Sequence, residues 1–150
     1  MANDPQTVAT PHGNLSYHVA GEGPALILLH GSGPGVTGME NFAGNLGFYA
    51  SRFRTYVPDL PGYGRSDPSP DGVDRSPEAI LAMMDALGIE KASLIGNSYG
   101  GFVASRFAAA YPDRVERIVA IGGLGFNILP PFPDGGINPL RGLVGGPTPR

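Results

Sequence analysis

The chain contains no cysteine among its 150 residues, which excludes disulfides, thiolate catalysis and cysteine-based metal sites. It has only three histidines, and the spacing of His12, His18 and His30 is not that of metal ligands. Charged residues make up 15% of the chain, and the net charge is −3. A chain this acidic lacks the basic stripe that nucleic-acid binding requires, so we expect no nucleic-acid partner.

Long hydrophobic runs and runs of like charge are absent as well. No apolar stretch reaches the roughly 18 residues of a membrane span, and the first residues, Met-Ala-Asn-Asp-Pro-Gln, are unlike a secretory signal. We therefore expect a cytoplasmic protein with no membrane partner. Gly and Pro are abundant, and residues 122–150 alone hold 8 Gly and 6 Pro. We expect a folded core over residues 1–121 and a separate Gly/Pro-rich segment over 122–150.

Short apolar runs alternate with helical patterns along the core. The run 25–30 is apolar on both faces and lies between glycines, which is typical of a buried parallel strand. A helix is expected between Ser76, as its N-cap, and Gly88, as its terminator. The other expected strands are 15–20, 55–57, 92–95 and one within 115–121, and the other expected helices are 39–53 and 102–111. This alternation predicts an α/β fold with a mainly parallel sheet.

The segment Gly96-Asn97-Ser98-Tyr99-Gly100 has the G-x-S-x-G pattern, and it follows a predicted strand and opens a predicted helix. A strand that reverses into a helix this sharply strains the central residue and projects its side chain. Side chains at 96 and 100 would collide with neighbouring backbone, which explains both glycines. The pattern predicts that Ser98 is a nucleophile; the alternative is an ordinary strand–helix turn.

A second glycine-rich turn, residues 31–35, follows the buried strand. Such a turn can direct backbone N–H groups at an oxyanion, and we expect the two donors to be the N–H groups of Ser32 and Tyr99. His30, at the strand end, is expected to be structural and to bond nearby backbone.

A different interpretation starts from Gly33-Pro34-Gly35-Val36-Thr37-Gly38, which has the G-x-G-x-x-G spacing of a dinucleotide site, with Asp59 about 20 residues further on. However, three residues, 30–32, separate the strand from the first glycine. This interpretation also leaves the Ser98 turn unexplained.

Residues 26–125 resemble the α/β-hydrolase superfamily. The segments that carry the resemblance are Leu-Leu-His-Gly-Ser-Gly-Pro-Gly at 28–35, Pro-Asp-Leu-Pro-Gly-Tyr-Gly-Arg-Ser-Asp at 58–67, Met-Asp-Ala-Leu-Gly-Ile-Glu-Lys-Ala at 84–92 and Gly-Asn-Ser-Tyr-Gly-Gly at 96–101. Within the superfamily, the loop 30–35, Asn41-Phe42 and Gly-Asn-Ser at 96–98 are similar to the meta-cleavage product hydrolases. These enzymes hydrolyse carbon–carbon bonds in the bacterial catabolism of aromatic compounds and steroids.

The resemblance implies Ser98 as nucleophile, a small-molecule dienoate substrate and no cofactor. It further implies that Asn41 and Asn97 line the site, and we expect Gly31 and Gly33 of the loop to contact substrate. From the residues alone, Asn41 is equally a polar residue at a helix start and Asn97 a turn former. Met39 departs from the family, which often has an aromatic residue there.

A catalytic base is missing from the second half of the chain. The family order is Ser, then Asp or Glu, then His, yet no histidine follows Ser98. The resemblance implies that this is the N-terminal half of a hydrolase, ending before the lid and the last two strands. We expect the 150 residues to be nearly inactive, as a fragment or a pseudoenzyme, and to self-associate through an exposed sheet edge.

Overall fold

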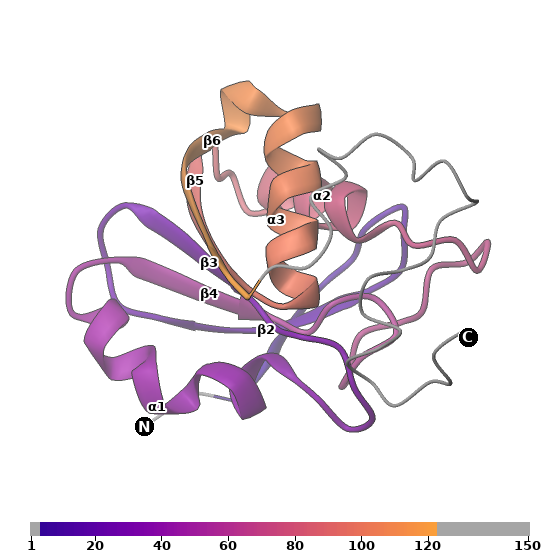
Figure 1. The fold of residues 1–150 in the computed structure, drawn as a ribbon, viewed down its shortest axis with the longest axis horizontal. Coiled ribbons are helices and arrows are strands. Elements are labelled where there is room, and N and C mark those ends of the chain that lie inside the picture. Colours follow the sequence, from indigo (N-terminus) through magenta and orange to yellow (C-terminus); the bar gives the residue numbers. More distant parts are fainter. Residues whose placement is uncertain (1–3, 123–150) are drawn as a thin grey trace, which may run out of the picture.

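The computed structural model describes residues 4–122. Their six strands form one sheet, which runs through the centre of the molecule (Figure 1). The strand order is β1-β2-β4-β3-β5-β6. The strands are β1 (Gln6–Val8), β2 (Leu15–Ala20), β3 (Ala25–Leu29), β4 (Arg54–Pro58), β5 (Ala92–Asn97) and β6 (Val115–Ile121). β4, β3, β5 and β6 are mutually parallel, whereas β2 is antiparallel to β1 and β4. The predicted α/β fold with a mainly parallel sheet is therefore confirmed.

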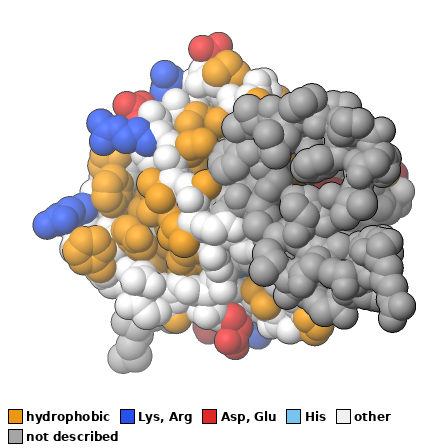
Figure 2. Space-filling model, in the orientation of Figure 1, with side chains coloured by type: hydrophobic (Ala, Val, Ile, Leu, Met, Phe, Trp, Pro, Cys, Tyr) orange, Lys and Arg blue, Asp and Glu red, His pale blue; other side chains and the backbone are white. Residues whose placement is uncertain are grey.

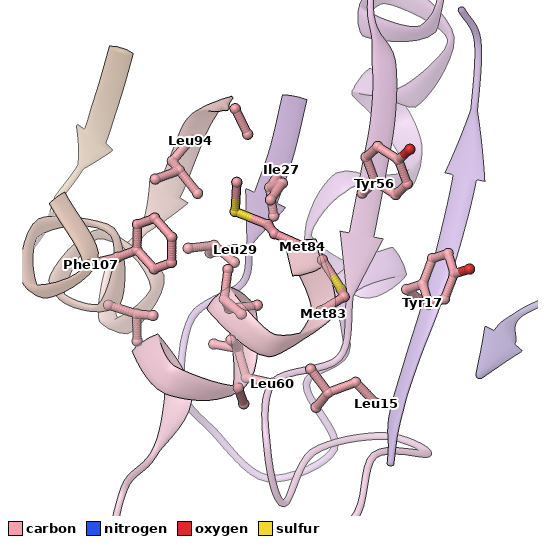
Figure 3. Packing of buried hydrophobic residues seen from close by; sticks show 14 of the residues in the cluster. Leu15, Tyr17, Ile27, Leu29, Tyr56, Leu60, Met83, Met84, Leu94 and Phe107 are labelled. Carbon is pink, nitrogen blue, oxygen red and sulfur yellow. The ribbon is translucent and has the colours of Figure 1, made fainter. Parts of the chain in front are cut away.

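β3 lies between two parallel neighbours, and its side chains alternate between two apolar cores. Ile27 and Leu29 belong to the larger core, which α2 (Ser76–Ala86) and α3 (Tyr99–Ala110) cover. Leu26 and Leu28 point to the other face, where α1 (Gly38–Ala50) supplies the covering side chains. Figure 3 shows part of the larger core, with α2 and α3 side chains packed against the sheet. Burial on both faces explains the unbroken apolar run.

The helix ends differ from the expected ones for local reasons. α2 ends at Ala86, and Gly88, with φ +68, terminates it as expected, because the Gly88 and Ile89 N–H groups bond back to the carbonyl groups of Asp85 and Met84. Ser76 is not its N-cap, however. The cap is Arg75, because the Ser76 N–H donates to Asp74 and its hydroxyl bonds a distant tyrosine.

The other two helices are shifted relative to the sequence pattern. α1 ends at Ala50 instead of residue 53, because the apolar pattern continues into a turn whose Phe53 still packs on the core. α3 begins at Tyr99 instead of residue 102, since the glycines at 100 and 101 hide its first turn from a propensity argument. A short 3₁₀ turn, η1 (Pro112–Arg114), leads into β6.

Among the described residues, β6 is an edge strand, and several of its side chains are exposed. Ile118, Val119 and Ile121 are 39%, 51% and 50% exposed, although large aliphatic side chains are usually buried. Figure 2 shows hydrophobic side chains gathered on the face in view, to the left of the grey region. Among residues 4–122, no further strand pairs with β6, so the exposed sheet edge expected from the sequence is found within this part of the chain. The segment 122–150 lies outside the described residues, apart from Gly122.

Candidate active site

Ser98 lies at the sharp turn between β5 and α3, with φ 52 and ψ −112. It is the only non-glycine residue within 4–122 that has a positive φ. Its N–H donates to the carbonyl oxygen of Ile121 at 2.8 Å, and its own carbonyl accepts from Phe102 at 3.2 Å. The strained backbone predicted for this serine is confirmed.

The two glycines of the pattern are required by close backbone contacts. A Cβ on Gly96 would lie within 3.0 Å of the Gly100 carbonyl group, and a Cβ on Gly100 within 3.0 Å of the Leu29 carbonyl group of β3. These neighbours are backbone atoms of the turn and of a central strand, which cannot move at small cost. The predicted collision at positions 96 and 100 is confirmed.

The loop after β3 packs against the serine. A Cβ built on Gly31 would lie 3.6 Å from the Ser98 Cβ, so these two segments are in van der Waals contact range. The Asn41 side-chain oxygen holds them together: it accepts from the Gly31 N–H at 2.8 Å and from the Asn97 side-chain amide at 3.1 Å. Among the residues expected at the site, Gly31, Asn41, Asn97 and Ser98 are thus brought together. Both bonds of the Asn41 oxygen are made within the protein, and one of them occupies the Gly31 N–H.

The two remaining loop residues of the expected site lie just beyond Gly31. Ser32 is exposed, and Gly33 is half-buried with φ +148. Within residues 4–122, no hydrogen bond occupies the backbone N–H of Ser32 or of Tyr99. Both groups expected to face an oxyanion are therefore unpaired by the described residues.

His30 is fully buried and bonded through both ring nitrogens. Nε2 accepts from the Leu60 N–H at 2.9 Å, which leaves the proton on Nδ1 to bond the Gly31 carbonyl oxygen at 2.7 Å. Burial lowers the pKa of His30, an effect that outweighs the Gly31 bond and the charge of Asp59. The ring packs edge-on against Tyr63. The structural role expected for His30 agrees with these contacts.

The structure contains a polar network beside Ser98 that the sequence analysis did not predict. The Tyr99 hydroxyl lies 3.0 Å from the Ser76 hydroxyl, and Arg106 pairs with Asp74 at 3.2 Å. Burial raises the pKa of Tyr99. Burial also acts to raise the pKa of Asp74, but bonds from Ser76 and Tyr99 and the Arg106 charge outweigh it, so the pKa is lowered. Because Tyr99 and Ser76 are 23 positions apart, no local pattern could have revealed their bond.

Asp59, the acidic residue of the dinucleotide interpretation, has a different use. Its carboxylate accepts from the Gly38 N–H at 2.9 Å and from the Arg65 N–H at 3.1 Å. It therefore caps the start of α1 and closes the loop after β4. Both of its oxygens are used by backbone N–H groups, so it is not placed as the acidic residue that would bind a ribose. In addition, α1 begins only at Gly38, nine residues after β3 ends at Leu29.

Other kinds of site find no support in the part of the chain that is described. Residues 4–122 contain no group of three or more His, Cys, Asp or Glu side chains placed to hold a metal ion. None of their helices is both long and apolar enough to cross a membrane. A cavity of about 580 Å³ is lined by residues 84–85, 88–91 and 113–114, around the start of β5. Ser98 follows the other end of that strand, so this cavity is separate from the candidate active site.

Comparisons with known proteins identify the class. The family model described as alpha/beta hydrolase fold matches residues 24–141, and the chain therefore belongs to this family. It is 43% identical over 143 residues to the 2-hydroxy-6-oxo-6-phenylhexa-2,4-dienoate hydrolase of Burkholderia cepacia, covering 90% of this chain and 50% of that relative. It is 41% identical to the 2-hydroxy-6-oxononadienedioate/2-hydroxy-6-oxononatrienedioate hydrolase of Comamonas testosteroni, with the same coverage.

A solved structure agrees with these relatives. A variant of the meta-cleavage product hydrolase of Pseudomonas fluorescens IP01 superposes with a TM-score of 0.76 at 36% identity, covering 80% of this chain and 45% of that one. The close relatives are thus meta-cleavage product hydrolases, as the sequence resemblance suggested. The chain spans about half the length of the curated relatives that it matches.

Proposed function

We propose that Ser98 is the nucleophile of a serine-dependent hydrolase whose complete form cleaves a carbon–carbon bond in a 2-hydroxy-6-oxo-dienoate. The observation that carries the proposal is the positive φ of Ser98 at the turn from β5 into α3. A non-glycine residue in such a conformation lowers the stability of the fold, and strained residues of this kind are concentrated at active sites. The contact of Gly31 with Ser98 supports the proposal, because it brings the glycine-rich loop to the same place.

The proposed chemistry uses one hydroxyl and two amides. The Ser98 Oγ adds to the substrate carbonyl carbon, and its proton passes to a base. The carbonyl oxygen then carries negative charge, which the N–H groups of Ser32 and Tyr99 would stabilise, with help from the N-terminus of α3. The bond beside this carbon breaks with its electron pair on the leaving group, which takes up a proton. Water finally releases the acid from Ser98.

The relatives support the proposed substrate class, since they are named for dienoate and dienedioate hydrolysis. Asn41 and Asn97 would border the substrate, and Gly31 and Gly33 would contact it from the loop 31–35. Because the Asn41 oxygen is already used, Asn41 would contribute its amide hydrogens only. An ester is the alternative substrate, since it needs the same serine and loop. Hydrolysis of a dienoate and of a p-nitrophenyl ester by the complete enzyme separates the two.

The base has to come from elsewhere. No histidine follows Ser98 in the sequence, and His30 is buried with both nitrogens bonded to backbone. This favours a second candidate function for the 150 residues taken alone: a chain that binds an acyl compound without turning it over. Loss of a triad base lowers turnover by roughly 10⁴ to 10⁶.

The test is covalent labelling of the chain by a fluorophosphonate, followed by mass spectrometry of the labelled peptide. We expect slow labelling at Ser98 and faster labelling when imidazole is added, because imidazole supplies the missing base. Ser98→Ala should abolish labelling. Ser105→Ala is the matched control, since Ser105 is a half-buried serine of α3 whose hydroxyl bonds only the Gly101 carbonyl among the described residues. No labelling with imidazole, or labelling that survives in Ser98→Ala, contradicts the nucleophile.

A further inference from the structure

The side chain of Tyr99 is anchored far from its backbone. Tyr99 is the first residue of α3, directly after Ser98, yet its hydroxyl reaches the start of α2 and lies 3.0 Å from the Ser76 Oγ. Ser76 is only 1% exposed and the bond is part-buried, so water competes with it less than with a bond at the surface. The tyrosine ring is held on its flanks by Tyr63 and Phe102, with ring centroids 6.3 and 6.4 Å away.

Ser76, to which the Tyr99 hydroxyl is bonded, is itself linked to both helices through Asp74. The Ser76 N–H donates to Asp74 Oδ1 at 3.0 Å, and Asp74 Oδ2 accepts from Arg106 of α3 at 3.2 Å. Asp74 therefore joins the start of α2 to the outer part of α3, while the Tyr99 hydroxyl joins α2 to the first turn of α3. The Asp74–Arg106 ion pair is exposed and contributes little by itself, whereas the part-buried Ser76–Tyr99 bond ends on a serine that is almost fully buried.

The strained serine needs support on both sides. On its N-terminal side, the Ser98 N–H is bonded to the Ile121 carbonyl oxygen. On its C-terminal side, the peptide between Ser98 and Tyr99 belongs to the first helical turn, whose N–H groups have no partner within the helix. Rotation of this peptide would change where the Tyr99 N–H points. Of the two Cα atoms that flank this peptide, that of Ser98 carries the proposed nucleophile, and that of Tyr99 carries the side chain that is bonded to Ser76.

We propose that the Tyr99 phenol is a positioning group that, through Ser76, sets the direction of the Tyr99 peptide N–H toward the Ser98 side chain. The inference rests on the proposed function, in which this N–H stabilises the oxyanion. The Tyr99 side chain touches no reacting atom; it acts through its own backbone.

The absence of cysteine makes a direct test available. Ser98→Cys introduces a single thiol at the turn of a chain that has no other. A thiol ionises without a general base, and N–H donors and a helix N-terminus lower its pKa from the ordinary value of about 8.5. The thiol pKa is measured by thiolate absorbance at 240 nm against pH, and independently from the pH dependence of alkylation by iodoacetamide.

The anchor is then removed in the Ser98→Cys background. We expect a thiol pKa at least about one unit below the ordinary value in the parent, rising by about half a unit in Tyr99→Phe and in Ser76→Ala, which is a roughly threefold loss of thiolate at neutral pH. Tyr111→Phe is the matched control, because Tyr111 also packs its ring in the core, and no hydrogen bond to its hydroxyl is found within residues 4–122. It should leave the thiol pKa unchanged.

The outcomes separate the two proposals. A normal thiol pKa in the parent overturns both the oxyanion environment and its positioning by Tyr99. A lowered pKa that neither anchor variant changes overturns the positioning role alone. Thermal unfolding is followed in parallel, because a merely structural role would lower the melting temperature without moving the thiol pKa. If Tyr99→Phe does not fold, Ser76→Ala decides, since it keeps the whole tyrosine.

Discussion

The close packing of Gly100 gives a sharp prediction of stability. In Gly100→Ala the new methyl group would meet the Leu29 carbonyl group and the His30 carbonyl oxygen, all closer than 3.0 Å. Overpacking of this kind costs about 1–3 kcal/mol, and the contacted atoms are backbone of a buried strand, which favours the upper end. Alanine in a helix recovers about 1 kcal/mol. We expect Gly100→Ala to lower the free energy of unfolding by about 2 kcal/mol.

The matched control is Gly47→Ala in α1. Gly47 is exposed, and a Cβ built on it meets nothing within 4 Å. The same substitution should therefore raise the free energy of unfolding by about 0.5–1 kcal/mol. Urea unfolding followed by circular dichroism measures both variants. The reasoning is refuted if the free energies of unfolding of Gly100→Ala and Gly47→Ala lie within about 0.5 kcal/mol of each other, because the turn at Gly100 would then have room for a methyl group.

Three further predictions concern the serine, the buried histidine and the edge strand. Ser98→Gly should raise the free energy of unfolding by about 1 kcal/mol in urea titrations, because glycine tolerates the positive φ, whereas Ser98→Ala should bring no gain. Because the pKa of His30 is lowered in the folded chain, its contribution to stability is complete above pH 6.5, its ordinary pKa, and is lost as the pH falls below that value, with a slope of at most about 1.4 kcal/mol per pH unit. His30→Gln should flatten the pH dependence of stability below about pH 6.5; an unchanged slope contradicts the assignment. Val119→Lys should reduce self-association in sedimentation velocity, because a lysine on an exposed edge strand opposes pairing; equal association of both chains would argue against the β6 edge as the contact.

The sequence was informative wherever one short segment decides the structure. The run 25–30 predicted a buried strand, Gly88 predicted a helix end, and Gly96 and Gly100 predicted a tight turn, because each depends on local backbone needs. β1 was not expected, since its three residues, of which only Val8 is buried, form no pattern. Its existence depends on pairing with β2.

Contacts between distant segments were out of reach of the same arguments. The Asn41 oxygen bonds Gly31 and Asn97, which are 10 and 56 positions away, so its role as a link between loops emerges only in three dimensions. The same holds for Tyr99 and Ser76. Ser76 looked like a helix cap because caps and distant hydrogen bonds use the same hydroxyl, and the sequence does not tell which partner wins.

The bond from the Ser98 N–H to the Ile121 carbonyl ties the catalytic candidate to the margin of the sheet. The last turns and edge strands of a protein open locally at much lower free energy than its centre. Each time the end of β6 frays, the serine loses the contact that fixes its amide. Because β6 is the outermost strand among residues 4–122, the lifetime of the proposed nucleophile's geometry depends on how firmly β6 is held. A contact that stabilised β6 would therefore also stabilise the position of Ser98 without touching it.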